Sequence, residues 1–310
     1  KMISFLANLF GYILNFIYNF IQNYGLAIIL FSILIKILMI PISIKQQKAM
    51  KKNLKMQEKM KEIQFKYKNN PEMLSQATME LYKTEKINPF GGCLSAIIQI
   101  ILLLAVFYLV RSPLTYMKKI SPDVIDKYSN VVKQYELSEI SGYPEIDIIR
   151  EIDNIKELRN KEITENSEEK VSISEIKEEE LNSMQINMNF LGLNLAQIPT
   201  KSSDWKAYII PALYVIVSVI SMRLTTSINK NNTKNQETSK SDEKALIKKE
   251  EEFDPMAQMN KNMSLMFPIM YLAVALIAPL GLALYWLTNS LLMIIERLAL
   301  NKLLKDEEEK

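Results

Sequence analysis

Histidine is absent from this chain of 310 residues, and cysteine occurs once, at Cys93. A disulfide within the chain is therefore excluded, and the zinc sites built from histidine and cysteine have no ligands. Glycine is also scarce, with seven residues, and we find no glycine-rich phosphate loop, nucleophile elbow or metal motif. We therefore expect no cofactor, no bound metal and no enzymatic activity.

A large excess of one charge is also missing. The net charge is +3, and no block combines basic residues with aromatic side chains that could stack on bases. We expect no DNA partner. Acidic residues are absent from the long apolar segments, which are residues 26–44, 93–110, 207–224 and 263–295.

The apolar segment 26–44 has the length of a membrane span. Nineteen residues at 1.5 Å each give roughly 28 Å, the thickness of the hydrocarbon core. Lys36 lies near its middle, too deep for its ammonium group to reach either interface. Because these four apolar segments contain no Asp or Glu, we expect no internal ion pair to neutralise Lys36. The expected partner is water, an amide such as that of Gln99, or an anionic group that enters the membrane.

Other spans also carry polar side chains on one helical face. Such stripes are typical of interhelical hydrogen bonds as well as of binding sites. A lysine at mid-depth favours a binding site, because ionisable groups within the membrane usually mark function. The candidate residues are Lys36, Ser32, Gln99, Ser95, Tyr214, Ser218, Tyr285, Trp286 and Asn289.

The first 24 residues predict an amphipathic helix lying in the membrane interface. Polar or small residues recur there every three or four positions, at Ser4, Asn8, Gly11, Asn15, Asn19 and Gln22.

Residues 45–86 contain eleven lysines and five glutamates, so the positive-inside rule places them in the cytoplasm and the amino terminus outside. Asn70-Pro71 interrupts two helical apolar patterns there and predicts a helical hairpin. The predicted order is an interfacial helix (1–24), a first span (25–44), a cytoplasmic hairpin (45–87), a second span (93–110), an extracytoplasmic loop (111–206), a third span (207–224), a cytoplasmic loop (225–261), a fourth span (262–277), a fifth span (279–299) and a cytoplasmic tail (300–310).

Several motifs in this order resemble the YidC/Oxa/Alb family of membrane protein insertases. They are KILMIP at 36–41, ELYKTEKINPFGGC at 80–93 followed by Gln99, YIIP at 208–211, and PLGLALYW at 279–286 followed by Asn289. The resemblance implies an all-α membrane protein in which five transmembrane helices surround a hydrophilic groove. It also implies that Lys36 takes the place of the family's intramembrane positive residue, usually Arg. Ser32 and Gln99 then match groove-lining positions, and Tyr285 and Trp286 match aromatic contacts of the last span.

We interpret the chain as an insertase and chaperone of the bacterial cell membrane. It would insert nascent membrane proteins from the cytoplasm into the lipid bilayer and help them to fold. The resemblance implies the Sec translocon and the ribosome or signal-recognition machinery as partners. The acidic tail gives no support for ribosome docking by a basic tail, although loop lysines could serve instead. The alternatives are a transporter for a small anion and a membrane scaffold that recruits partners through the hairpin.

Overall fold

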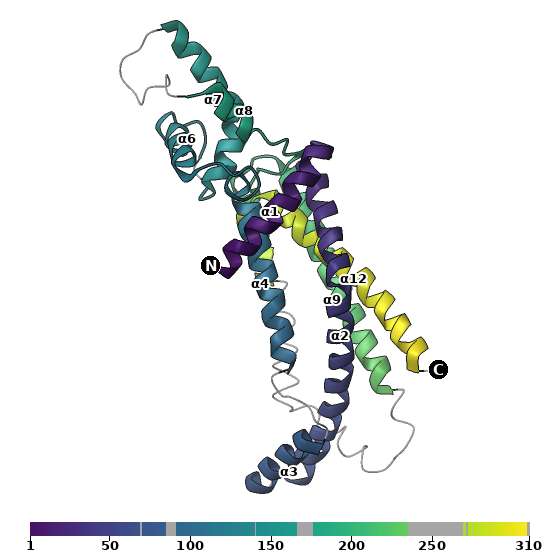
Figure 1. Cartoon of the computed structure of the whole chain (residues 1–310). Coiled ribbons are helices and arrows are strands. Elements are labelled where there is room, and N and C mark those ends of the chain that lie inside the picture. Colours follow the sequence, from purple (N-terminus) through teal and green to yellow (C-terminus); the bar gives the residue numbers. More distant parts are fainter. Residues whose placement is uncertain are drawn as a thin grey trace. The chain divides into compact units, whose positions relative to one another are not determined.

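The computed structural model describes residues 1–68, 70–84, 91–139, 141–165, 176–234, 269–270 and 272–308. Helices dominate this part of the chain (Figure 1). The elements are α1 (Met2–Ile21), α2 (Tyr24–Lys66), α3 (Pro71–Thr84), α4 (Gly91–Arg111), α5 (Pro113–Tyr116), α6 (Pro122–Gln134), α7 (Pro144–Glu165), α8 (Glu178–Met184), β1 (Asn189–Phe190), β2 (Leu193–Asn194), the 3-10 helices η2 (Pro199–Lys201) and η3 (Trp205–Tyr208), α9 (Ile209–Lys234) and α12 (Leu280–Glu308).

The chain divides into two compact units. The first unit comprises Lys1–Ile35, Leu102–Ser221 and Met266–Met293, and the second comprises Lys36–Ile101, Met222–Leu265 and Ile294–Lys310. Each unit is described below by itself.

Four helices in the described part are long and apolar enough to cross a membrane. Three of them, at Tyr24–Ala49, Trp205–Leu224 and Leu280–Leu303, overlap the predicted first, third and fifth spans. The all-α membrane fold class is therefore confirmed. The predicted second span coincides with α4, and most of the predicted fourth span lies outside the described residues. The fourth apolar helix is α1, whose predicted interfacial location stays a prediction.

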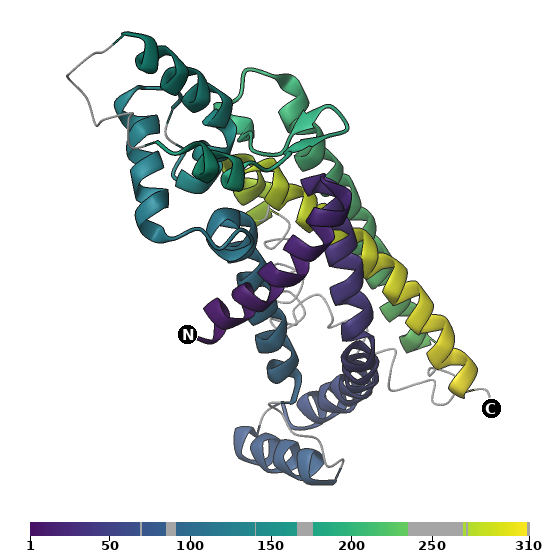
Figure 2. The same cartoon turned by 45° about the horizontal axis from the view of Figure 1, so that its top comes forward.

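The predicted first span and the first arm of the hairpin form one continuous helix, α2, of 43 residues (Figure 1). Pro41 lies inside it and has no N–H to donate to the preceding turn. After α2 ends at Lys66, the Asn70 side chain accepts a hydrogen bond from the backbone N–H of Met73 (3.1 Å) and caps α3. In the second unit, α3 lies beside the last part of α2, and the Thr78 hydroxyl donates to Met60 Sδ (3.6 Å; Figure 2).

Helix α1 has two apolar faces. One is buried in the first unit and contains Ala7, Phe10, Leu14 and Tyr18. Gly11, which the sequence pattern places on a polar face, lies on this buried face because α1 packs against α5. The opposite face is exposed and mostly aromatic, with Phe5, Leu9, Tyr12, Phe16 and Phe20.

The segment expected to be an extracytoplasmic loop contains folded helices, an organisation that the sequence analysis did not anticipate. Helix α6 packs against α7, and α7 against α8 (Figure 2). Tyr128, Ile155 and Leu181, one from each helix, are completely buried. Lys127 Nζ donates to Glu180 Oε2 (2.5 Å), which also accepts from the Tyr128 hydroxyl (3.0 Å), so that α6 is tied to α8.

A buried carboxylate ties α7 to α5. Glu145, in the first turn of α7, accepts hydrogen bonds from the backbone N–H (3.0 Å) and the hydroxyl (2.7 Å) of Thr115. Burial raises the pKa of Glu145, and the bonds from Thr115 oppose that rise.

The residues on either side of the β1–β2 hairpin bind the first turns of two long helices. Asn187 O accepts from the N–H of Tyr24, the first residue of α2 (3.0 Å). Leu195 O accepts from the N–H of Gly281 in the first turn of α12 (2.9 Å). These N–H groups have no partner within their own helices, so the hairpin segment supplies the acceptors that both helix starts need.

Replacing Gly11 with alanine is expected to destabilise the first unit. A Cβ atom there would overlap the backbone carbonyl of Tyr116 in α5. We expect a loss of about 1–3 kcal/mol in the free energy of unfolding, measured by thermal unfolding in mild detergent. Gly281→Ala is the matched control, because its Cβ would meet its nearest atom at an ordinary 3.5 Å. An equally stable Gly11→Ala protein would contradict the close packing of α1 on α5.

Candidate functional site

Lys36 forms an ion pair with Glu296 inside the second unit. Lys36 Nζ lies 2.6 Å from Glu296 Oε2, and the two side chains are only 20% and 13% exposed. Lys36 belongs to α2 and Glu296 to α12, and both residues lie within helix segments apolar enough to span a membrane. The pair therefore joins two long helices through opposite charges in largely apolar surroundings.

This ion pair corrects the sequence analysis. The expectation that no internal carboxylate neutralises Lys36 is wrong, because Glu296 directly follows the acid-free apolar segment 263–295. Helix α12 continues to Glu308 and its apolar part to Leu303, so Glu296 belongs to the same apolar helix. Sequence reasoning thus missed Glu296. The available signal was that the acid follows an apolar run with no helix-breaking residue in between.

One oxygen of the pair is still available for a further contact. Glu296 Oε1 is buried and has no hydrogen-bond partner among the residues that the structure describes. A buried carboxylate oxygen without a donor is costly. The site can therefore accept one more donor from a water molecule or from a bound chain.

Two predicted site residues of the first unit use their hydroxyl groups within their own helices. Ser32 Oγ donates to the carbonyl of Ile28 (2.7 Å), and Ser218 Oγ donates to the carbonyl of Tyr214 (2.7 Å). Ser32 is buried and Ser218 half-buried. Their oxygen lone pairs can still accept a hydrogen bond, since each hydroxyl has both donor and acceptor capacity.

The aromatic candidates lie in the buried core of the first unit. Tyr214, Tyr285 and Trp286 belong to one hydrophobic cluster and are 5%, 8% and 7% exposed. Asn289, one turn beyond Tyr285, is half-buried.

The side chains of Ser95 and Gln99 lie outside the described residues, although both positions are helical in α4. Lys36 belongs to the second unit, while Ser32, Tyr214, Ser218, Tyr285, Trp286 and Asn289 belong to the first. A common groove formed by all the candidates therefore stays a prediction.

Comparisons with known proteins agree with the motifs. The family model described as "60Kd inner membrane protein" matches residues 16–308. Proteins named "Membrane protein insertase YidC" are similar over shorter stretches. The one from Chlorobaculum parvum is 53% identical over 53 residues, which are 17% of this chain and 9% of that protein. The one from Cupriavidus necator is 47% identical over 53 residues, or 17% and 10% of the two chains.

A third relative of the same name, from Burkholderia multivorans, is 45% identical over 51 residues, or 16% of this chain and 9% of the relative. The chain thus aligns with about a tenth of the length of these curated relatives.

The Lys36–Glu296 pair predicts a specific pattern of stabilities. Lys36→Leu or Glu296→Leu alone leaves a charge without its partner and should lower the free energy of unfolding by about 1–3 kcal/mol. The double substitution should cost less than the sum of the two, because it removes both charges. The free energy of unfolding is measured in mild detergent for the purified wild type, the two single variants and the double variant.

The matched control is the more exposed ion pair between Arg159 and Glu178, whose side chains are 23% and 66% exposed. The coupling energy is the difference between the effect of the double substitution and the sum of the two single effects on the free energy of unfolding. For the Arg159–Glu178 pair it should be about 0–1 kcal/mol. If the effects of the single substitutions at Lys36 and Glu296 simply add, the two residues do not form a stabilising pair.

Proposed function

Because the chain belongs to the 60Kd inner membrane protein family, the YidC/Oxa1 family, we propose that it is a membrane protein insertase and chaperone. It receives nascent membrane proteins and lowers the cost of moving their hydrophilic tails across the bacterial cell membrane. It acts by binding and release and performs no chemical catalysis. The match over residues 16–308 carries this proposal.

The polar candidates supply the chemistry for this role. A hydrophilic tail that enters hydrocarbon loses its hydrogen bonds to water, at several kcal/mol for each unsatisfied group. Side chains such as Ser32, Gln99 and Asn289 offer replacement hydrogen bonds at that depth. The apolar segment of the substrate then passes into lipid along the apolar surfaces of the spans.

The ion pair gives the site a resident anion. An acidic group on the substrate exchanges with Glu296 at the Lys36 ammonium, so that the lysine is never left without a counter-charge. Such an exchange costs less than hydrating a bare ammonium within the membrane. Glu296 is thus a competitor of the substrate and sets how strongly an acidic tail must bind to enter.

The remaining parts of the proposal concern topology and partners. The amino terminus is outside and the lysine-rich hairpin formed by α2 and α3 is in the cytoplasm, as the positive-inside rule favours. There the hairpin lysines meet the ribosome or the signal-recognition machinery, and the protein acts alone or with the Sec translocon.

Complementation of an insertase-depleted bacterium tests this function. The substrate has one span and an acidic extracytoplasmic tail, and protease protection measures its insertion. Wild type and Lys36→Arg should support insertion, whereas Lys36→Ala should lower the rate roughly tenfold through loss of one charge-assisted contact. Glu296→Gln should keep or increase the rate for an acidic tail, because it removes the competing anion.

Ser183→Ala is the control, since Ser183 lies on α8 outside the candidate groove and its hydroxyl donates to the nearby carbonyl of Glu180 (2.7 Å); this variant should insert the substrate normally. Failure of a well-folded wild type would contradict the insertase. Normal insertion by Lys36→Ala would show that the charge of Lys36 is not used.

A further inference from the structure

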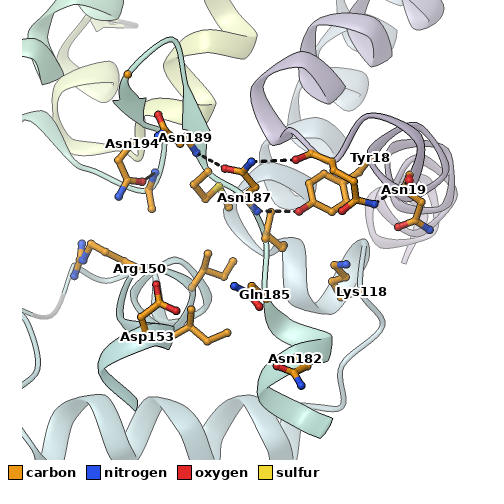
Figure 3. Close-up of a pocket in the computed structure, with 17 residues that line it drawn as sticks. Tyr18, Asn19, Lys118, Arg150, Asp153, Asn182, Gln185, Asn187, Asn189 and Asn194 are labelled. Carbon is orange, nitrogen blue, oxygen red and sulfur yellow. Dashed lines mark hydrogen bonds between the residues drawn. The ribbon is translucent and has the colours of Figure 1, made fainter. Parts of the chain in front are cut away.

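A polar pocket of about 770 Å³ lies in the first unit. Its walls come from the end of α1, from α7 and α8, and from the segment that runs into the β hairpin (Figure 3). The insertase function proposed above assigns no role to this pocket. Seven of its lining residues are Asn or Gln, contributed by α1, α8 and the hairpin segment.

Hydrogen bonds hold the wall of the pocket in place before any ligand binds. The backbone N–H of Asn187 donates to the Tyr18 hydroxyl (2.8 Å), and Asn187 Nδ2 donates to the carbonyl of Gln22 (3.1 Å; Figure 3). Asn187 Oδ1 in turn accepts from the N–H of Asn189 (3.1 Å). These bonds fix the segment at Asn187 against the end of α1, so this wall is preorganised, which lowers the entropic cost of binding.

One further amide of the lining is already engaged, because Gln185 Oε1 accepts a hydrogen bond from Lys156 Nζ (3.1 Å). By contrast, Asn182 on α8 and Asp153 on α7, which also line the pocket (Figure 3), make no side-chain hydrogen bond or ion pair within the described part of the chain. Lys118 faces them from the other wall, where burial lowers its pKa. Arg150 is already engaged, because it contacts Asp147 (2.9 Å) and Glu151 (3.1 Å).

The chemistry of this lining suits a polypeptide backbone. A peptide chain presents one N–H donor and one C=O acceptor at nearly every residue, and carboxamides offer both complementary groups. The charges are few and of both signs, which does not favour a polyanion. The Tyr18 ring is 3% exposed and has the Lys118 ammonium 5.0 Å from its centroid, so this ring offers little surface on which a sugar or base could stack.

We propose that this pocket binds an extended, hydrophilic segment of a substrate protein through its backbone, after that segment has crossed the membrane. The proposal rests on the insertase function and on an extracytoplasmic location of α6–α8. It gives the folded segment after α4 a role: holding the translocated tail so that it does not slip back.

Peptide binding to the full chain in lipid nanodiscs tests the proposal. The probe is a fluorescein-labelled dodecapeptide of Ser, Thr, Asp and Gly, and anisotropy measures its affinity. A peptide of the same sequence with N-methyl groups on alternate residues should bind at least tenfold more weakly, because it lacks half of the backbone donors. Asn182→Leu should weaken binding of the unmodified peptide roughly fivefold.

Glu179→Leu is the matched control, because Glu179 is also an exposed residue of α8 but does not line the pocket. It should bind like wild type. Equal binding of the two peptides, no binding of the unmodified peptide, or displacement of the peptide by maltohexaose would overturn the proposal.

The insertion assay distinguishes this proposal from the function on which it rests. If Lys36-dependent insertion is normal but the peptide does not bind, the insertase remains and the pocket proposal fails. If the peptide binds with the expected pattern but no substrate is inserted, the pocket binds polypeptide and the insertase proposal fails.

Discussion

The free-energy cost of leaving a charge without a partner in an apolar helix determines how α2 and α12 pair in the second unit. Lys36 lies in a helix segment that is otherwise suited to hydrocarbon, and its ammonium is held 2.6 Å from the carboxylate of Glu296. Because neither group tolerates loss of the other, the pair fixes the register between α2 and α12 at this point. The same dependence underlies the proposed exchange, in which a carboxylate of the substrate would replace Glu296 at Lys36.

In the first unit, close packing and backbone hydrogen bonds hold helices whose surfaces are mostly apolar. Helix α1 approaches α5 closely at Gly11, and presents aromatic side chains on the other face. The hairpin segment supplies carbonyl groups to the first turns of α2 and α12. Backbone donors at these helix starts are thus satisfied by the chain itself, as a site bordering lipid requires.

The two proposed sites share a physical logic. In both proposals a translocating tail would lose water at the intramembrane candidates and would be held by backbone contacts once it leaves them. Charge would act on the first step, through Lys36 and Glu296. Carboxamides would act on the second, because the peptide backbone is the feature that substrates of different sequence have in common.

The amino-acid sequence by itself determined the all-α membrane class and the family, and it predicted helical segments that overlap α2, α3 and α4. Each of these depends on a local pattern: an apolar length, a helical period, a break at Asn70-Pro71, or a motif such as PLGLALYW. Such patterns are read within a few turns of one helix, so no distant contact is needed to recognise them. Lys36 was also recognised from a local pattern, because it is the one charged residue in the apolar segment 26–44.

Only the tertiary structure decided which groups meet across long distances in the chain. It paired Lys36 with Glu296, buried Gly11 against Tyr116, and joined α1 to α8 and the hairpin segment around one pocket. None of these contacts has a periodic signal, because each joins residues on different elements. The physical reason is that burial and charge compensation depend on which faces pack together, and a single helix does not specify its neighbour.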